Sequence, residues 1–258
     1  MTVARHLENL KYRGHSLMPG VISRDEAADL CKRLDSLYDE QRREFGEQRL
    51  RELNEFEVHR GLMAADSIFA TLVVHPMILE VVDAVVGPTA ILNLQNASAA
   101  SPGAIHFQSR LHRDFARDFV ASKPLALNAF WCITDFTADA GATWLVPGTH
   151  RHGELPSEEF AEQNAVQIEA PAGSVILWDG LLLHKAGQNR TDRVRYGINH
   201  MYTRPFIKQQ MDYPVFLRGK YEVESRLGQL LGFWTIPPKS VTEFRVDPDK
   251  RTYRRNQG

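Results

Sequence analysis

The sequence predicts a mainly β protein with flanking helices, in which an antiparallel sandwich or barrel carries the core. Seven short segments rich in apolar residues lie between residues 90 and 203, separated by Gly, Pro, Asp or Asn, and no long helix lies between them. This succession favours antiparallel β layers over a doubly wound parallel sheet. The 258 residues suit a single domain, because all-β barrels reach roughly 200–250 residues without splitting.

Residues 1–89 are predicted to form a mostly helical lead-in. Ser23 and Glu26 have the spacing of a capping box, and apolar residues follow at helical spacing. A helix is therefore expected from about Arg24 into the forties. Pro76 can begin a second, short buried helix that ends at a Gly-Pro pair.

Residues 90–205 form the predicted β core, and residues 206–246 a partly helical cover whose best helical segment runs from Glu222 to Leu231. The last residues, 247–258, are polar and are expected to form a flexible tail. The expected strands are residues 90–99, 106–114, 125–136, 142–147, 165–171, 174–180 and 194–203.

Charge and cysteine usage narrow the class of protein. With 31 basic and 32 acidic residues, the net charge of −1 offers no bulk field for nucleic acid or an anionic membrane, so a small-molecule substrate is the expected partner. Cys31 and Cys132 are expected to be thiols, which suits a reducing cytoplasm. The first residues lack the apolar core of a signal peptide, and no segment approaches the roughly 20 apolar residues of a membrane span. We expect a cytoplasmic protein.

The triplet His112-Arg113-Asp114, followed 70 positions later by His184, predicts a metal site. Side chains two apart on a strand share a face, so His112 and Asp114 can reach one ion while Arg113 points away. Two histidines and one carboxylate on one side of a ferrous ion leave other positions open for a co-substrate and dioxygen. Each histidine alone is more simply explained as a packed side chain, but together they favour iron.

Arg195 follows His184 by 11 positions, inside a predicted strand whose alternation turns it inward. A buried guanidinium needs a partner, and a carboxylate matches its planar fork. Gly197 would leave room for such a ligand, and Arg193 competes for the same role.

A polar substrate wall is predicted on one condition. If the strand runs unbroken from His106 to Asp114, then Gln108 and Arg110 share the inward face with the metal ligands. Asn128 is a further candidate for substrate contact. These residues favour a small polar substrate, and residues 204–213 are candidates to cover the mouth of the pocket.

Several motifs together resemble the phytanoyl-CoA dioxygenase-like family of iron(II)/2-oxoglutarate-dependent oxygenases. They are LHRDF, GATWLVPGTHRHG and LLLHKAGQNRTDRVRYGINHMYTRP, and the resemblance extends through HPMILEVVDAVVGP and RPFIKQQMDYP to most of the chain. It implies a double-stranded β-helix, the jelly-roll fold of cupin-like barrels. It also implies iron(II) held at the positions of His112, Asp114 and His184, with Arg195 binding the far carboxylate of the co-substrate 2-oxoglutarate.

The resemblance also marks weaker positions around the co-substrate. Trp131 matches an aromatic position that can line its pocket, although a core role is at least as plausible for it. Gln95 is a weaker candidate for a polar contact. Two positions after His184, where some relatives carry a hydroxyl residue, this chain has Ala186, so that contact is missing or supplied elsewhere.

The implied reaction is hydroxylation with dioxygen, in which 2-oxoglutarate gives succinate and carbon dioxide. Halogenating relatives replace the carboxylate ligand with a small residue, whereas Asp114 is present here. Two alternatives stay open. A cupin-like metalloenzyme that does not use 2-oxoglutarate would not need an inward Arg195, and a sensor of the same fold would bind iron and 2-oxoglutarate without turnover.

Overall fold

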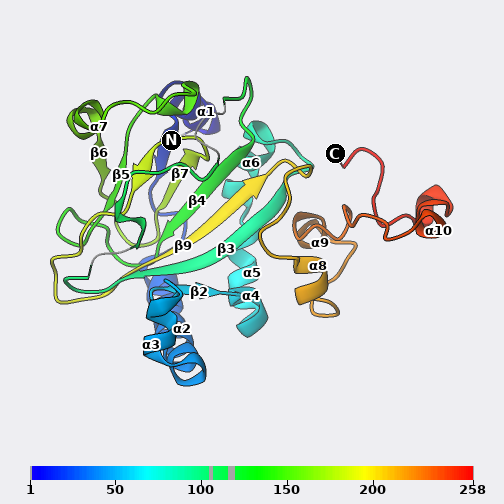
Figure 1. Cartoon of the computed structure of the whole chain (residues 1–258), viewed down its shortest axis with the longest axis horizontal. Coiled ribbons are helices and arrows are strands. Elements are labelled where there is room, and N and C mark those ends of the chain that lie inside the picture. Colours follow the sequence, from blue (N-terminus) through cyan, green and yellow to red (C-terminus); the bar gives the residue numbers. More distant parts are fainter. Residues whose placement is uncertain (1, 105–106, 116–119, 258) are drawn as a thin grey trace.

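The computed structural model describes residues 2–104, 107–115 and 120–257 and consists of two antiparallel sheets with helices on the outer face of the larger one (Figure 1). The larger sheet has the order β1-β7-β4-β9-β3-β2, and the smaller has the order β6-β5-β8. The strands of the larger sheet are β1 His15–Met18, β2 Val58–Arg60, β3 Ile91–Ala100, β4 Ala126–Cys132, β7 Val175–Asp179 and β9 Arg195–Thr203; those of the smaller are β5 Thr143–Leu145, β6 Val166–Ile168 and β8 His184–Lys185.

The two faces of the larger sheet pack against different parts of the protein. On β4, Trp131 and Leu127 belong to the main apolar core, which the sheet shares with the N-terminal helices. Phe130 belongs to a second apolar cluster with Trp178 of β7 and Leu145 of β5. Successive strand residues therefore point alternately to the helices and to the smaller sheet. The second face lies toward the smaller sheet.

Helices of the first 89 residues cover the outer face. Ser23 and Glu26 form the predicted capping box at the start of α2, whose buried residues include Leu30 and Leu34. The predicted helix at Pro76 is also present. The helices of this part are α1 Val3–Arg13, α2 Arg24–Phe45, α3 Glu47–Glu52, α4 Leu62–Ala65, α5 Ile68–Val73 and α6 Pro76–Val85.

The rest of the chain adds short helices only. Of the segment expected to be helical, Glu222 to Leu231, only the shorter α9 forms. The side chain of Ser225 accepts a hydrogen bond from the N–H of Gly228, so Ser225 is the N-cap and the helix begins directly after it. No helix among the described residues is long and apolar enough to cross a bilayer. The remaining helices are α7 Glu158–Asn164, α8 Tyr213–Phe216, α9 Arg226–Leu230 and α10 Val241–Phe244, and the 3-10 turns are η1 Phe107–Ser109, η2 Thr149–Arg151 and η3 Pro248–Lys250.

One predicted strand is wrong, and three strands were not predicted. Of the segment 106–114 the structure describes residues 107–114, and these do not form one strand: η1 occupies Phe107–Ser109, and among them only His112 forms a β-bridge, to His184. The unpredicted strands β1, β2 and β8 have four, three and two residues, too few for a clear alternation.

Candidate metal centre and its cavity

The three predicted metal ligands come together between the two sheets. The ligand atoms of His112, Asp114 and His184 all lie within 4.8 Å of one another. Nε2 of His184 is 3.8 Å from Oδ1 of Asp114, and the two imidazole ring centres are 4.3 Å apart. This donor set of two imidazoles and one carboxylate suits ferrous iron.

The backbone fixes which nitrogen each imidazole presents. The Nδ1 atoms of His112 and His184 lie 2.8 and 2.9 Å from the carbonyl oxygens of Arg110 and Leu182. A carbonyl only accepts, so each Nδ1 carries the proton and each Nε2 keeps its lone pair for a metal. Burial and the neighbouring His184 ring lower the pKa of His112, which favours the neutral, metal-binding form.

The peptide groups of the two histidines also bond to each other. The N–H of His112 donates to the carbonyl of His184 at 2.9 Å, and the reverse bond measures 3.0 Å. These paired bonds fix the relative position of the two rings although their residues are far apart in the sequence. The bridge replaces the long strand that the sequence predicted here.

Asp114 is oriented by a neighbour on β4. The Nδ2 group of Asn128 donates to Oδ2 of Asp114 at 2.7 Å, and Nδ2 of Asn199 donates to Oδ1 of Asn128 at 3.0 Å. One carboxylate oxygen is thereby occupied, and Oδ1 faces His184. Asn128, expected at the substrate, is fully buried, and its amide bonds to the carboxylate of a predicted metal ligand.

The triad lines a cavity of about 180 Å³ between the sheets. Gln108 also lines it, but from η1 and not from the unbroken strand on which its prediction depended. Phe130 and Trp178 form an aromatic wall, and the Trp178 ring centre lies 5.2 Å from that of His184. Gln210 lines the cavity as well, so the segment 204–213 contributes to its wall.

Arg195 lines the same cavity and is 2 % exposed, whereas its competitor Arg193 is exposed to solvent. The Arg195 guanidinium lies 4.4 Å from the ring centre of Phe136, and its Nε and Nη1 atoms are buried without a hydrogen-bond partner among the described residues. Burial lowers the pKa of Arg195 to about 10. A buried, incompletely paired cation beside the three predicted ligands can pair with an anion.

Two details near Arg195 differ from the sequence analysis. The space left by Gly197 holds the Phe130 ring, which would lie 2.5 Å from an added Cβ, so it is not ligand space. A hydroxyl that the sequence analysis missed is that of Thr143, which lines the cavity and is 5 % exposed. β5 pairs with β8 through Leu145–His184 and Trp144–Lys185. The residues next to these pairs, Thr143 and Ala186, both line the cavity, and Ala186 is the position at which the hydroxyl of some relatives is missing.

Two aromatic and polar candidates lie on the other face of the larger sheet. Trp131 is fully buried in the core against the helices, and its Nε1 group donates to Nδ1 of His200 at 3.2 Å. Gln95 accepts from the N–H of Met63 at 3.2 Å and donates to the carbonyl of Phe69 at 3.1 Å. Neither lines the cavity, because strand alternation turns both toward the helices.

The broken strand also removes Arg110 from the wall. Its side chain is exposed and outside the cavity, and only its carbonyl contributes, by holding His112. His106, which the same strand was to place inward, lies outside the described residues. Arg113 points away from the ligands as predicted and donates to the carbonyls of Thr149 and His152, each at 2.7 Å.

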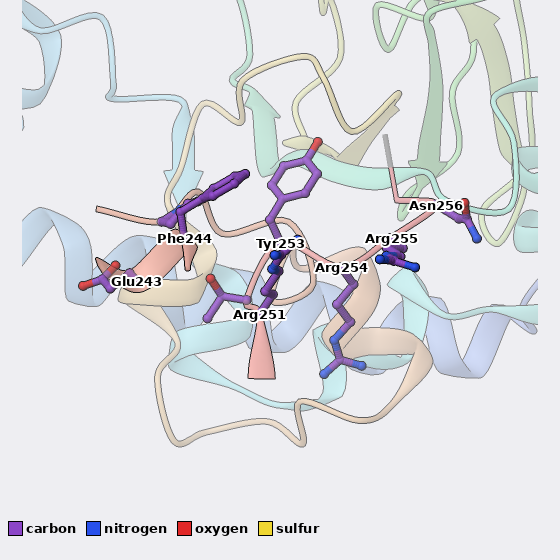
Figure 2. A pocket seen from close by; sticks show the side chains of 9 residues that line it. Glu243, Phe244, Arg251, Tyr253, Arg254, Arg255 and Asn256 are labelled. Atoms are coloured by element: carbon purple, nitrogen blue, oxygen red, sulfur yellow. The ribbon is translucent and has the colours of Figure 1, made fainter. Parts of the chain in front are cut away.

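A separate hollow of about 470 Å³ lies in the C-terminal segment (Figure 2). Its walls include Phe244, Tyr253 and three arginines, of which Arg251 stacks on Phe244 at 5.2 Å and Arg254 pairs with Glu224. It shares no lining residue with the triad's cavity and therefore adds nothing to that site.

Comparisons with known proteins agree on the family. The family model described as phytanoyl-CoA dioxygenase matches residues 11–197. An uncharacterized protein of Mycobacterium tuberculosis is 37 % identical over 260 residues, covering 95 % of this chain and 92 % of the relative. Dioxygenase af480 of Aspergillus fumigatus is 30 % identical over 195 residues, covering 71 % of this chain and 61 % of the relative.

Solved structures share the fold. One is the non-heme alpha ketoglutarate dependent epimerase SnoN from nogalamycin biosynthesis, with a TM-score of 0.56, 20 % identity and coverage of 78 % of this chain and 82 % of that chain. Another is apo HygX from Streptomyces hygroscopicus, with a TM-score of 0.61, 18 % identity and coverage of 85 % and 94 %. With the family model spanning most of the sequence, the chain belongs to the phytanoyl-CoA dioxygenase family.

Proposed function

We propose that the protein is an iron(II)- and 2-oxoglutarate-dependent dioxygenase that hydroxylates a small polar substrate. The observation that carries this proposal is one small cavity lined both by a His-Asp-His triad and by a buried, incompletely paired guanidinium, that of Arg195. A metalloenzyme without an anionic co-substrate would leave this buried cation without a function and at a cost in stability. Family membership and the likeness to SnoN support the same chemistry.

In this proposal each group has a defined task. His112 and His184, each through Nε2, and Asp114, through its carboxylate, would hold iron(II). Arg195 binds the far carboxylate of 2-oxoglutarate, and the Thr143 hydroxyl is placed in the same cavity to assist it. When bound, iron and 2-oxoglutarate supply the oxidising power of dioxygen, with release of succinate and carbon dioxide.

The substrate side of the cavity is polar. Gln108 and Gln210 bring amides to it, and Arg60 lies at its wall, held by Glu55 through bonds of 2.7 and 2.8 Å. Arg60 is already paired with a carboxylate, but the half-buried Lys185 also lines the cavity, so the wall offers both hydrogen bonds and positive charge. A small polar compound or natural-product intermediate matches such a wall better than a hydrocarbon.

The same proposal includes the type of fold and the number of domains. The two facing antiparallel sheets with the site between them are arranged as we expect for a double-stranded β-helix. Residues 1–258 then form one oxygenase domain, with the helices of the first 89 residues supporting the larger sheet and the segment after residue 205 closing one side.

The test is turnover. Purified protein with iron(II), 2-oxoglutarate and dioxygen is offered a collection of small polar metabolites, and succinate is measured together with the mass of each compound. We expect succinate in equal amount to a product that has gained one oxygen atom, and none from Asp114→Ala. Binding of iron and 2-oxoglutarate without succinate from any compound would favour a sensor, and a product isomeric with its substrate would replace hydroxylation by epimerisation.

A further inference from the structure

Two asparagines connect the cavity wall to the carboxylate of the triad. Nδ2 of Asn199 on β9 donates to Oδ1 of Asn128 on β4 at 3.0 Å, and Nδ2 of Asn128 donates to Oδ2 of Asp114 at 2.7 Å. Asn128 is fully buried, and Asn199 lines the cavity. The series runs in one direction, from an amide donor at the wall to a carboxylate acceptor at the metal site.

The direction of the series depends on Asn199. An asparagine side chain can turn over and exchange its oxygen and nitrogen at little steric cost, so only hydrogen bonds choose between the two states. If Asn128 turned over, its oxygen would face the carboxylate of Asp114, which is repulsive. The donor from Asn199 occupies the Asn128 oxygen and selects the state in which Asn128 donates to Asp114.

The orientation of Asn199 is set by the same bond. Its Oδ1 atom is buried and has no hydrogen-bond partner among the described residues. On the sheet, Asn199 is paired with Phe130 of β4 on one side and with Asn96 of β3 on the other. Its amide therefore gains its one described hydrogen bond by donating to Asn128.

We propose that Asn199 is a positioning residue for Asp114 and acts through Asn128. This inference rests on the proposed function, since it assigns Asp114 to the metal. With Oδ2 held by Asn128, Asp114 binds the ion through Oδ1 alone, which preserves the coordination positions that co-substrate and dioxygen require. Loss of the Asn199 donor frees the carboxylate to rotate and to bind through both oxygens.

Cobalt(II) tests this proposal, because its visible spectrum reports coordination number and its titration gives an affinity without turnover. The full chain is titrated as wild type, Asn199→Ala, Asn128→Ala and the double variant. Asn96→Ala is the matched control, since Asn96 loses the same amide from the same cavity, directly across the strand pair from Asn199. Groups that orient a metal ligand typically contribute about 10–100-fold to metal affinity.

We expect Asn199→Ala to raise the cobalt(II) Kd about 10-fold and to shift the spectrum toward higher coordination number. Asn128→Ala should have a larger effect, and the double variant should bind no more weakly than Asn128→Ala. Asn96→Ala should keep the wild-type Kd and spectrum. Asn199→Leu, which preserves volume without a donor, should behave as Asn199→Ala and provides a second variant if alanine impairs folding.

The outcomes separate this inference from the proposed function. A wild-type chain that binds no cobalt(II) would remove the metal site and with it the proposed function. If the wild type binds but both Asn199 variants keep its Kd and spectrum, the function stands and the positioning role of Asn199 is refuted. Additive losses in the double variant would equally refute action through Asn128.

Discussion

Replacement of Arg195 by methionine should have opposite effects on the free protein and on co-substrate binding. Burial lowers the pKa of Arg195 from 12.5 to about 10, and each pKa unit corresponds to about 1.4 kcal/mol, so keeping this charge buried costs about 3 kcal/mol. Methionine removes that cost and also removes the stacking on Phe136, worth about 2 kcal/mol for a desolvated pair. The free protein should therefore gain about 1 kcal/mol of stability.

The same substitution should weaken 2-oxoglutarate binding. Removing one partner of a buried charge pair costs about 2–5 kcal/mol, and the lower figure is already about a 30-fold rise in Kd. Urea unfolding of the metal-free protein measures the first effect, and calorimetric titration of 2-oxoglutarate into the anaerobic iron(II) protein measures the second.

Arg193→Met is the matched control, because Arg193 lies two residues away on the same segment but is exposed. It should leave both quantities unchanged. An Arg195→Met protein that is less stable than the wild type, or that binds 2-oxoglutarate with the wild-type Kd, would refute the assignment of Arg195 as a buried cation awaiting an anion.

Three further perturbations have expected results. His184→Ala should raise the iron(II) Kd by more than about 100-fold, beyond the effect of groups that only orient a ligand, and an anaerobic chelator competition showing wild-type affinity would rule His184 out as a ligand. Burial lowers the pKa of His200 to about 3, below its unfolded value of 6.5, so the stability that its neutral form gives is complete above pH 6.5 and declines as the pH falls; urea unfolding should lose about 2 kcal/mol between pH 7.5 and 5, and His200→Gln should flatten this dependence. A wild-type stability that does not change over this range would contradict it. Gly197→Ala should cost about 1–3 kcal/mol and weaken 2-oxoglutarate binding, because the new Cβ meets the Phe130 ring and drives it into the cavity; an unchanged urea midpoint would show that the ring has room to move.

The sequence predicted those features that depend on residue type, on spacing and on neighbours within a few residues. The triad needs only residue type and separation, and its members do meet. Alternation turned Arg195 inward but placed Arg193, two residues earlier, on the same face, so it could not choose between them; the structure buries Arg195 and exposes Arg193, which precedes β9. The capping box at Ser23 likewise depends on neighbours within one turn.

The sequence could not predict which face of the sheet a side chain takes in a strand that is buried on both sides. Every residue of β4 is buried, so no hydrophobic alternation tells whether Trp131 or Phe130 faces the cavity. On β3 the pairing shifts between Leu92 and Leu94, just before Gln95, and such an irregularity changes the face of everything beyond it. The sequence therefore left Trp131 open between the co-substrate pocket and the core, and it gave no sign that Gln95 faces the helices.

Contacts between residues on different strands could not be predicted from the sequence either. Thr143 and Ala186 reach one cavity only through the pairing of β5 with β8, and Asn128 and Asn199 meet only through the pairing of β4 with β9. The turn at Phe107–Ser109 contains no Gly or Pro, the residues that usually mark the end of a strand. The sequence therefore predicted one continuous strand up to His112.

Anaerobic addition of iron(II) and then 2-oxoglutarate to the purified protein tests the central claim most directly. If the triad holds iron and Arg195 holds the far carboxylate, a visible charge-transfer band of a bidentate keto-acid complex should appear only when both are present. The band should be absent from His112→Ala and should require far more 2-oxoglutarate in Arg195→Met. A wild-type protein that binds iron(II) but gives no such band with saturating 2-oxoglutarate would contradict the account.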